Sequence, residues 1–535
     1  MSIPQHPEAP FTILAADAVT PPEIAPRLAP SGSGVIDGEG FRVMEVARLF
    51  TSVRRTQTHT GACVLYRSLS QPLAEREALV AKQAALRRLD QDAVLREQLT
   101  ALVNTAAIHE KGLYDLLYAR FIGLMGQPAS ELEREGYGYG AYNDSAAFVA
   151  SLVEGAEKMQ AVDTPYLEQR LQRIRQFRHS RAWALLRGPV YRSEQQVLVA
   201  SEKPWYVPAV RFRPSLFKPF ALLGGVALLV LAMTFVPMLL DIASSIAPAL
   251  WLFLLPIALL YIPMAGSFDR DGIIYPLRLA VRQSEAMADL MDALGELDEL
   301  LGFLAWRDEF PLPATLPVWL EDGPHRLRAE AMRNPVLAQE NPDYVGNDIT
   351  LDGERLTFIT GPNSGGKTAF SKTLAQCQLL AQAGGFVPCL RLELSVADHI
   401  DYQVPETSQL ADGEGRFGTE LKRTRDLFLR ASERSLVIMD ELSEGTTHEE
   451  KINISRSILE GFARKGCSAL LITHNHELVD DFSRRRQGQT LQVEFAGDHP
   501  TYHLVPGISR VSHADRIARK IGFSREDIDR HLGGG

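Results

Sequence analysis

The chain has 535 residues, of which 45% are hydrophobic and 23% are charged, and its formal net charge is −10. At roughly 150 residues per domain, this length predicts about three domains. The negative charge argues against a diffuse attraction of the whole protein to nucleic acid, and the scattered cysteines, which form no Cys-x-x-Cys pair, argue against a zinc site or a disulfide-stapled secreted domain: Cys63, Cys377, Cys389 and Cys467.

The N-terminal part is predicted to be helical after a loose lead-in. Residues 1–40 are rich in Pro and Gly and carry no signal-peptide pattern. Residues 41–210 show apolar residues at helical spacing, which indicates the first part of a helical domain. A basic run within it has no acidic residue between Glu168 and Glu194, and is either a solvated helix face or a surface for anionic lipid or nucleic-acid phosphates: Arg170, Arg173, Arg175, Arg178, Arg181, Arg187 and Arg192.

Two charge-free runs follow, at 219–240 and 242–268, separated by Asp241. A bilayer core of about 30 Å needs roughly 20 helical residues, so residues 217–268 are predicted to form a two-helix transmembrane hairpin. The competing interpretation is a hairpin buried inside a soluble core. Basic residues flank both runs and are absent from the linker, which places both flanks and the soluble parts in the cytoplasm, at the cytoplasmic membrane: Arg211, Arg213, Lys218, Arg270 and Arg278.

The rest of the chain reads as a return helix and an α/β domain. Residues 271–310 form a long amphipathic pattern that ends at a Pro-rich stretch. Residues 311–508 alternate β-rich runs with helical segments, as in an α/β sheet, and residues 509–535 close the chain with a helical segment. The predicted fold class is therefore multidomain: an α-helical core interrupted by a transmembrane hairpin, followed by an α/β P-loop ATPase domain.

A glycine-rich loop in the α/β domain predicts a nucleotide site. It fits G-x-x-x-x-G-K-[ST], follows a strand-like run and opens a helix, so that its backbone N–H groups can cradle phosphates. Lys367 would reach the β- and γ-phosphates and Thr368 would ligate Mg²⁺, which makes ATP and Mg²⁺ the expected cofactors. The loop consists of Gly361, Pro362, Asn363, Ser364, Gly365, Gly366, Lys367 and Thr368.

Acidic and basic groups at two later strand ends complete this predicted site. The strand SLVIM delivers Asp440, expected to hold Mg²⁺, and Glu441, expected to deprotonate the attacking water. A third strand, SALLIT, ends at His474, placed to contact the γ-phosphate or that water. The nearby His476 lacks a strand-end position and is expected to be structural.

These motifs resemble the MutS family of ATPases. FITGPNSGGKT is similar to that family's phosphate loop, ERSLVIMDELSEGTT to its acidic strand, and LLITHNHEL to its histidine motif. The stretch LADGEGRFGTELKRTRDLF resembles the segment that crosses the dimer interface, and residues 502–528 resemble the helices used for dimerisation. The resemblance implies a homodimer, and makes Tyr344 the candidate for stacking on adenine, with a buried core tyrosine as the alternative.

The chain also departs from the family pattern. No phenylalanine is followed two residues later by glutamate, so mismatch reading by a Phe-x-Glu wedge is not expected. The expected hairpin lies where relatives insert a DNA clamp, and a C-terminal nuclease domain such as another branch of the family carries is not expected. In the loop after Glu441, Ser443 and Glu444 replace a small-then-basic pair, and Gly415 and Arg416 replace a hydroxyl-bearing pair.

The sequence therefore favours a membrane-anchored, homodimeric ATPase that switches conformation with its nucleotide and acts on an unknown protein partner. The alternative is a membrane-tethered DNA-binding protein of the mismatch-repair type. In it, the arginines of the basic run would bind DNA phosphates, and ATP would control the binding. A transporter is disfavoured, because two spans per subunit are few for a pore and contain few polar residues.

Overall fold

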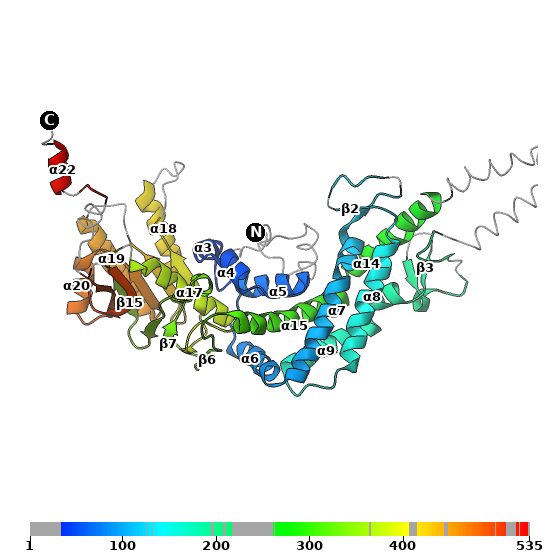
Figure 1. Ribbon diagram of the computed structural model, residues 1–535, viewed down its shortest axis with the longest axis horizontal. Coiled ribbons are helices and arrows are strands. Elements are labelled where there is room, and N and C mark those ends of the chain that lie inside the picture. The colour runs from blue at the N-terminus through cyan, green and yellow to red at the C-terminus, as the bar shows by residue number, and fades with distance from the viewer. Residues whose placement is uncertain are drawn as a thin grey trace, which may run out of the picture.

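The computed structural model describes the chain except for residues 1–33, 125, 131, 194–196, 207–209, 217–260, 262, 363–364, 406–414, 443–447, 498, 510–520, 524 and 533–535. The molecule is elongated, with the sheets at one end and a helical unit extending from them (Figure 1).

The helical unit is built from two parts of the chain that are far apart in sequence. Helix α15 (Glu285–Glu309) packs along α5 (His59–Ser70) and α9 (Pro165–Gln176), and α7 (Ala93–Tyr118) packs against α8 (Tyr139–Lys158). The remaining helices of the unit are α3 (Gly38–Val43), α4 (Val46–Val53), α6 (Arg76–Gln91), α10 (Arg181–Arg187) and α14 (Tyr275–Arg282), with a π-helix at Arg270–Ile274 and 3₁₀ turns at Phe177–His179 and Ala200–Glu202. The helical unit also contains short strands: β1 (Arg120–Phe121), β2 (Glu133–Arg134), β3 (Val190–Arg192), β4 (Val197–Val199) and β5 (Val210–Arg211).

Two buried carboxylates from different helices hold the first turn of α5. Asp298 of α15 accepts hydrogen bonds from the backbone N–H of Thr58 at 2.7 Å and from its hydroxyl at 2.6 Å. Glu110 of α7 accepts from the N–H of His59 and of Thr60, both at 2.9 Å. Because the first N–H groups of a helix have no partner within it, these carboxylates supply the missing acceptors. They thereby join α5, α7 and α15 through one polar cluster.

The C-terminal part is an α/β domain with two sheets. The larger sheet has the strand order β11-β12-β13-β9-β14-β15, in which all neighbours are parallel except β15, which runs antiparallel to β14. Its strands are β9 (Leu356–Thr360), β11 (Ile400–Gln403), β12 (Leu436–Asp440), β13 (Ser468–Ile472), β14 (Gln489–Ala496) and β15 (His499–Pro506). The smaller sheet has the order β6-β10-β7-β8: β6 (Val318–Trp319), β7 (Leu327–Met332), β8 (Asn347–Leu351) and β10 (Arg391–Leu394).

Helices cover both faces of the larger sheet. Ile359 and Ile438 belong to the core that contains α17 (Lys367–Gln382), whereas Phe358 and Met439 pack with α19 (His448–Lys465) and α20 (His476–Arg484) on the other face. Successive strand residues point to opposite faces, so strands buried on both sides are apolar throughout. Further helices are α16 (Leu337–Glu340), α18 (Gly415–Arg430) and α22 (Arg525–Leu532).

The structure corrects the predicted membrane hairpin at 217–268. No helix among the described residues is long and apolar enough to cross a bilayer. Residues 217–260 and 262 lie outside the described part. At the described end of the second run, Gly266 lies against the ring of Tyr137, and the Arg192 guanidinium lies 3.9 Å from the ring centroid of Phe268.

The physical reason is that an absence of charge was interpreted as contact with lipid, whereas Gly266 and Phe268 at the described end of the run contact Tyr137 and Arg192 of the same chain. The predicted fold class is therefore corrected to a helical unit followed by a mixed α/β domain with several sheets. The predicted location at the cytoplasmic membrane depended on the hairpin and is overturned with it.

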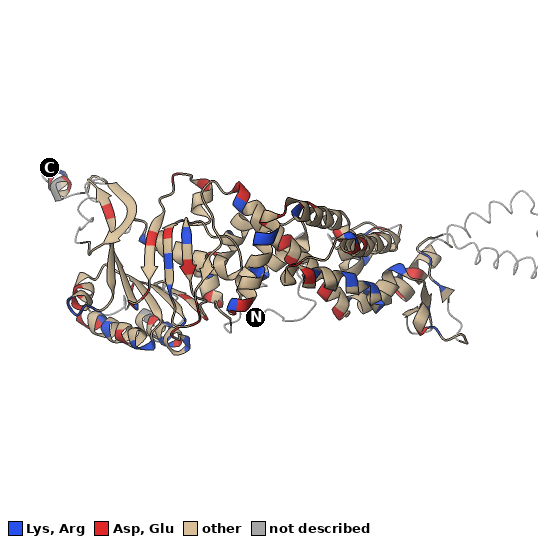
Figure 2. Ribbon diagram, turned by 90° about the horizontal axis from the view of Figure 1, so that it is seen from below, with Lys and Arg blue, Asp and Glu red and all other residues tan. Residues whose placement is uncertain are grey.

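The basic run is largely neutralised by carboxylates of the same unit. Arg170 pairs with Glu296 at 2.7 Å, and Arg178 pairs with Glu157 at 2.8 Å. Figure 2 shows basic and acidic residues interspersed along the helices. This arrangement favours the solvated-face interpretation over a phosphate-binding surface, because paired guanidinium groups carry little net charge. Further pairs are Arg175 with Glu168 and Arg181 with Glu202.

Candidate nucleotide-binding site

Three neighbouring parallel strands end at the same edge of the larger sheet. β13 lies between β12 and β9, so the residues that follow each of these strands converge. Gly361 follows β9, Glu441 follows β12, and Thr473 follows β13. The carboxyl edge of an open parallel sheet is where such folds bind ligands, because loops and helix N-termini meet there.

The glycine-rich loop connects β9 to α17. Gly361 and Gly366 have φ angles of 135° and 80°, a region that side chains with a Cβ rarely adopt, so glycine allows the tight loop. Gly366 is the N-cap of α17, so the unpaired N–H groups of the first turn face the loop. Asn363 and Ser364, predicted members of this loop, lie outside the described residues.

Lys367 is buried at the start of α17. Its side chain is 2% exposed, and Nζ donates a hydrogen bond to the carbonyl oxygen of Gly361 at 2.5 Å. Burial lowers the pKa of Lys367 to about 8, and the negative charges of Asp440 and Glu441 act in the opposite direction. A desolvated ammonium group at this place attracts an anion more strongly than one in water would.

Thr368 and Asp440 meet across the site. The Thr368 hydroxyl donates to Oδ2 of Asp440 at 2.9 Å. Burial raises the pKa of Asp440; the hydrogen bond from Thr368 lowers it, and the charge of Glu441 raises it further. A hydroxyl and a carboxylate side by side are oxygen ligands of the kind that Mg²⁺ prefers, so this pair fits the predicted metal position.

Glu441 is held firmly by the neighbouring strand end. Its φ of 62° is unusual for a residue with a side chain, and its side chain is nearly buried. Oε1 accepts from the backbone N–H of His474 at 2.7 Å, and Oε2 accepts from the hydroxyl of Thr473 at 3.0 Å. Lys451 of α19 approaches Oε2 at 3.6 Å. These contacts fix the carboxylate at the sheet edge.

His474 lies in the same cluster as Glu441. Its pKa is lowered, first by burial and then by the positive charge of Lys367, while Glu441 opposes the shift. The ring is therefore held mainly neutral near pH 7, so it can donate and accept one hydrogen bond each. His476, by contrast, is the first residue of α20.

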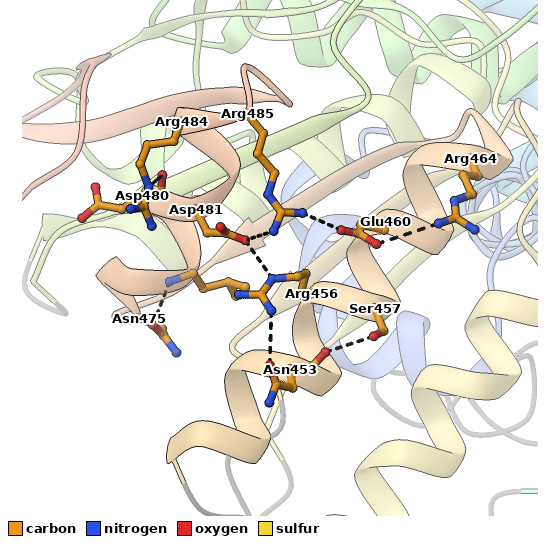
Figure 3. Close-up of polar contacts among 11 residues, drawn as sticks. Asn453, Arg456, Ser457, Glu460, Arg464, Asn475, Asp480, Asp481, Arg484 and Arg485 are labelled. Atoms are coloured by element: carbon orange, nitrogen blue, oxygen red, sulfur yellow. Dashed lines mark hydrogen bonds and ion pairs between the residues drawn. The ribbon is translucent and has the colours of Figure 1, made fainter.

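A polar network fixes the two helices that support this cluster (Figure 3). Asn475 caps α20 by accepting from the N–H of Leu478 at 3.1 Å. Asp481 of α20 accepts from Arg456 of α19 at 2.7 Å, and Arg485 bridges Asp481 at 3.0 Å to Glu460 at 2.9 Å. Since α19 carries Lys451 and α20 follows His474, the network positions both groups around Glu441.

A cavity of about 360 Å³ opens beside the glycine-rich loop. Gly365 and Gly366 line one side of it, and Tyr344 and Tyr502 also line it. The Tyr344 hydroxyl lies 3.4 Å from the Thr373 hydroxyl, so this ring is anchored to α17. An apolar cavity with aromatic walls next to a phosphate cradle has the size and chemistry to take a flat ring.

Asn347 fixes the strand that carries Tyr502. Its side-chain amide donates to the Tyr502 carbonyl at 3.0 Å and accepts from the Leu504 N–H at 2.7 Å. The sequence motifs did not reveal these residues, because they become neighbours of the loop only when β15 returns beside β14 and β8. Thr473 was missed for a different reason: it directly precedes His474, and only its hydroxyl contact with Glu441 reveals its role.

Several predicted positions are not brought into this cluster. Ser443 and Glu444 lie outside the described residues. Gly415 and Arg416 begin α18, and only their backbone is described. The predicted C-terminal segment 509–535 is described only at residues 509, 521–523 and 525–532, where α22 (Arg525–Leu532) forms.

A glycine-rich loop between a parallel strand and a helix, facing an acidic strand end, is the arrangement of the P-loop motif. Residues 357–530 match the family model described as MutS domain V. The resemblance to the MutS family is thereby confirmed for this domain.

The relatives are DNA mismatch repair proteins. The chain is 32% identical over 254 residues to "DNA mismatch repair protein MutS" of Thermotoga sp. (strain RQ2), covering 46% of this chain and 31% of the relative. It is 29% identical over 262 residues to the protein of the same name from Prochlorococcus marinus (strain MIT 9301), covering 47% and 29%. It is also 31% identical over 255 residues to "DNA mismatch repair protein spellchecker 1" of Drosophila melanogaster, covering 46% and 28%.

The chain thus spans about a third of the length of the curated relatives it matches.

Proposed function

We propose that this protein binds ATP with Mg²⁺ at the carboxyl edge of the larger sheet and hydrolyses it. The observation that carries the proposal is the contact between Thr368 and Asp440 at 2.9 Å, made one residue after the buried Lys367. This contact joins the glycine-rich loop to the acidic strand end. A phosphate cradle and a pair of metal ligands are the two parts that phosphoryl transfer requires.

Each residue of the cluster has a distinct role in this proposal. The loop from Gly361 to Gly366 would present the backbone N–H groups of Asn363, Ser364, Gly365 and Gly366 to the phosphates. Pro362 has no N–H and would shape the turn. Lys367 would bind the β- and γ-phosphates, and Thr368 and Asp440 would hold Mg²⁺. When bound, Mg²⁺ would neutralise negative charge on the phosphate oxygens.

Glu441 would orient the attacking water and take its proton, since its carboxylate is already held by Thr473 and His474. His474 would hydrogen-bond the γ-phosphate or this water. Tyr344 would stack on the base in the 360 Å³ cavity, with Tyr502 as a second aromatic wall.

We infer further that the protein works as a homodimer that changes conformation with its nucleotide and transmits the change through the helical unit. Support comes from the resemblance of the region around α18 and of the C-terminal segment to the family's dimer contacts. Sedimentation with and without ATP and Mg²⁺ tests this part. A monomer under every nucleotide condition would overturn it.

Phosphate release with ATP and Mg²⁺ tests the enzymatic part, with Lys367→Met as the inactive control. The wild-type protein should release phosphate only when Mg²⁺ is present, and Lys367→Met should lose at least about 100-fold of the rate. Equilibrium binding of labelled ATP accompanies the assay. A wild-type protein that neither binds nor hydrolyses ATP would overturn the proposal.

A second candidate function is DNA binding under nucleotide control, which the names of the mismatch-repair relatives favour. The pairing of Arg170, Arg175, Arg178 and Arg181 with carboxylates argues against the basic run as the contact surface. Duplex binding measured against salt concentration tests the candidate. Binding that weakens steeply with salt would support it, and no binding at low salt, with or without ATP, would rule it out.

A further inference from the structure

The far end of helix α17 is attached to the helical unit. At its start, α17 carries Lys367 and Thr368 of the candidate nucleotide site; its 16 residues then extend about 24 Å. At its end, Gln382 exchanges two hydrogen bonds with the chain between α5 and α6: its carbonyl accepts from the Leu73 N–H at 2.9 Å, and its side-chain amide donates to the Leu73 carbonyl at 2.8 Å. One rigid helix therefore joins the nucleotide loop to the helical unit.

Lys82 makes the second attachment and is the most buried cation of the helical unit, with 3% exposure. Its ammonium group donates to the carbonyl of Ala383, immediately after α17, at 2.7 Å, and to Oε2 of Glu299 at 2.7 Å. Lys82 belongs to α6 and Glu299 to α15. A single side chain thus connects α17 with two helices that lie far from it in sequence.

The site around Lys82 is built closely around it. Gly384 has a φ of 85°, and a Cβ at this position would come within 2.6 Å of the Lys82 side chain. The Phe303 ring centroid lies 5.5 Å from the ammonium group. A cation at the end of a helix also complements the partial negative charge of its carbonyl groups. These features together favour an ammonium group at this position.

Removing Lys82 would take away the hydrogen-bonded counter-ion of Glu299. Glu299 is 1% exposed, and its other oxygen, Oε1, has no hydrogen-bond partner among the described residues. A buried carboxylate without its counter-ion is strongly unfavourable, so any movement of Ala383 must carry Lys82 and Glu299 with it or break these bonds.

The helices around Lys82 also have room to move. A cavity of about 630 Å³ lies among α5, α6, α9 and α15, and both Lys82 and Glu299 line it. Closely packed interfaces resist sliding, whereas an adjoining cavity lets α6 shift without overlap of atoms.

We propose that Lys82 is the positioning residue that transmits the nucleotide state from α17 to α6 and α15. This inference rests on the proposed function, because it needs ATP to bind at the loop that begins α17. Phosphates drawn to the first turn displace the helix, and the Ala383 carbonyl then moves Lys82 and, through it, Glu299. The coupling resides in a network with defined contacts, not in proximity alone.

Amide hydrogen exchange of the full chain, with and without ATP and Mg²⁺, tests the proposal. In the wild-type protein, ATP should change the exchange of peptides from α6 (Arg76–Gln91) and α15 (Glu285–Glu309). In Lys82→Met this nucleotide-dependent change should fall at least about fourfold, while the Kd for ATP stays within about threefold, because Lys82 does not line the nucleotide site.

Two further variants keep the test decisive. The double variant Lys82→Met/Glu299→Leu replaces the buried pair with apolar side chains, so it should recover the folding stability that Lys82→Met loses, yet still lack the response of α6. Arg170→Met is the matched control: it removes the Arg170–Glu296 pair of the same unit, which forms no hydrogen bond or ion pair with the described residues of α17, and should keep the wild-type response.

The outcomes separate the inference from the function on which it rests. If the double variant folds, binds ATP and retains the wild-type response in α6 and α15, the inference is overturned. An equal loss of response in Arg170→Met would also overturn it, because the effect would then reflect general loosening of the unit. If the wild-type protein binds no ATP, the proposed function itself fails, and the inference fails with it.

Discussion

The hydroxyl of Thr368 donates a hydrogen bond to Oδ2 of Asp440 at 2.9 Å, although 72 residues separate the two along the chain. This contact places the first turn of α17 against the end of β12. We therefore expect both side chains to contribute to one Mg²⁺ site.

Asp440→Asn should weaken the dependence of activity on Mg²⁺. An amide is a poorer ligand than a carboxylate for a hard cation, so the concentration of Mg²⁺ at half-maximal ATPase rate should rise at least about tenfold. The measurement is a titration of Mg²⁺ at saturating ATP. Glu477→Gln, on α20, provides a control outside the cluster and should leave the titration unchanged.

Glu441→Gln should separate binding from hydrolysis. The amide cannot take a proton from water, so the rate should fall about 10²- to 10⁴-fold while ATP still binds. Single-turnover phosphate release and equilibrium binding are the two measurements. Glu449→Gln, which changes an exposed carboxylate on α19, should keep the wild-type rate. Normal hydrolysis by Glu441→Gln would remove Glu441 from the role of base.

Affinity for ATP should depend on pH through Lys367. Burial lowers the pKa of Lys367 to about 8, and only its protonated form attracts phosphate. Bound phosphates favour the proton, so affinity is highest below pH 8 and falls as the pH rises through that value. Between pH 7 and pH 9 the Kd should rise about tenfold. Lys367→Arg stays protonated over this range, so its profile should be flat; a flat profile in the wild-type protein would contradict the assignment.

Tyr502→Ala should weaken binding of the base without affecting the phosphates. Loss of one aromatic wall should raise the Kd for ATP by about threefold to tenfold, as expected for one aromatic contact. Affinity for inorganic tripolyphosphate should not change. Equal weakening of both ligands would mean that Tyr502 supports the loop at Gly366 rather than the base.

Asp298→Ala should destabilise the helical unit strongly. The substitution leaves the Thr58 N–H and hydroxyl without their buried acceptor, so the free energy of unfolding should fall by about 2–4 kcal/mol. Urea unfolding followed by circular dichroism measures it. Asp292→Ala on the same helix removes a half-exposed pair with Arg67 and should cost about 1 kcal/mol or less. Equal losses would show that the contacts of Asp298 with Thr58 add little to the folding stability.

The sequence predicted the centre of the candidate site because local rules determine it. A glycine-rich loop after an apolar strand, and acidic residues at a second strand end, lie at the same sheet edge because β9 and β12 are parallel members of one sheet, with only β13 between them. These local rules are enough to propose four residues of the site: Lys367, Asp440, Glu441 and His474. Tyr502 could not be found in this way, because its position depends on the antiparallel return of β15 and on the hydrogen bonds of Asn347.

The errors came from long-range packing. The charge-free run that ends at Phe268 was interpreted by its composition, but its described end packs against Tyr137 and Arg192. The two interpretations of the basic run stayed open for the same reason, because Glu296, which pairs with Arg170, lies 126 residues later. No local pattern reveals such a pairing.

The contact of Thr58 with Asp298 spans 240 residues, and this separation has a consequence for biosynthesis. When α5 leaves the ribosome, the acceptor for its first turn has not yet been translated. The N-terminal helices therefore keep apolar faces exposed to solvent until α15 has been synthesised. Chaperone binding to nascent chains should accordingly peak before α15 is synthesised and decline afterwards, because α15 then covers the exposed apolar surface.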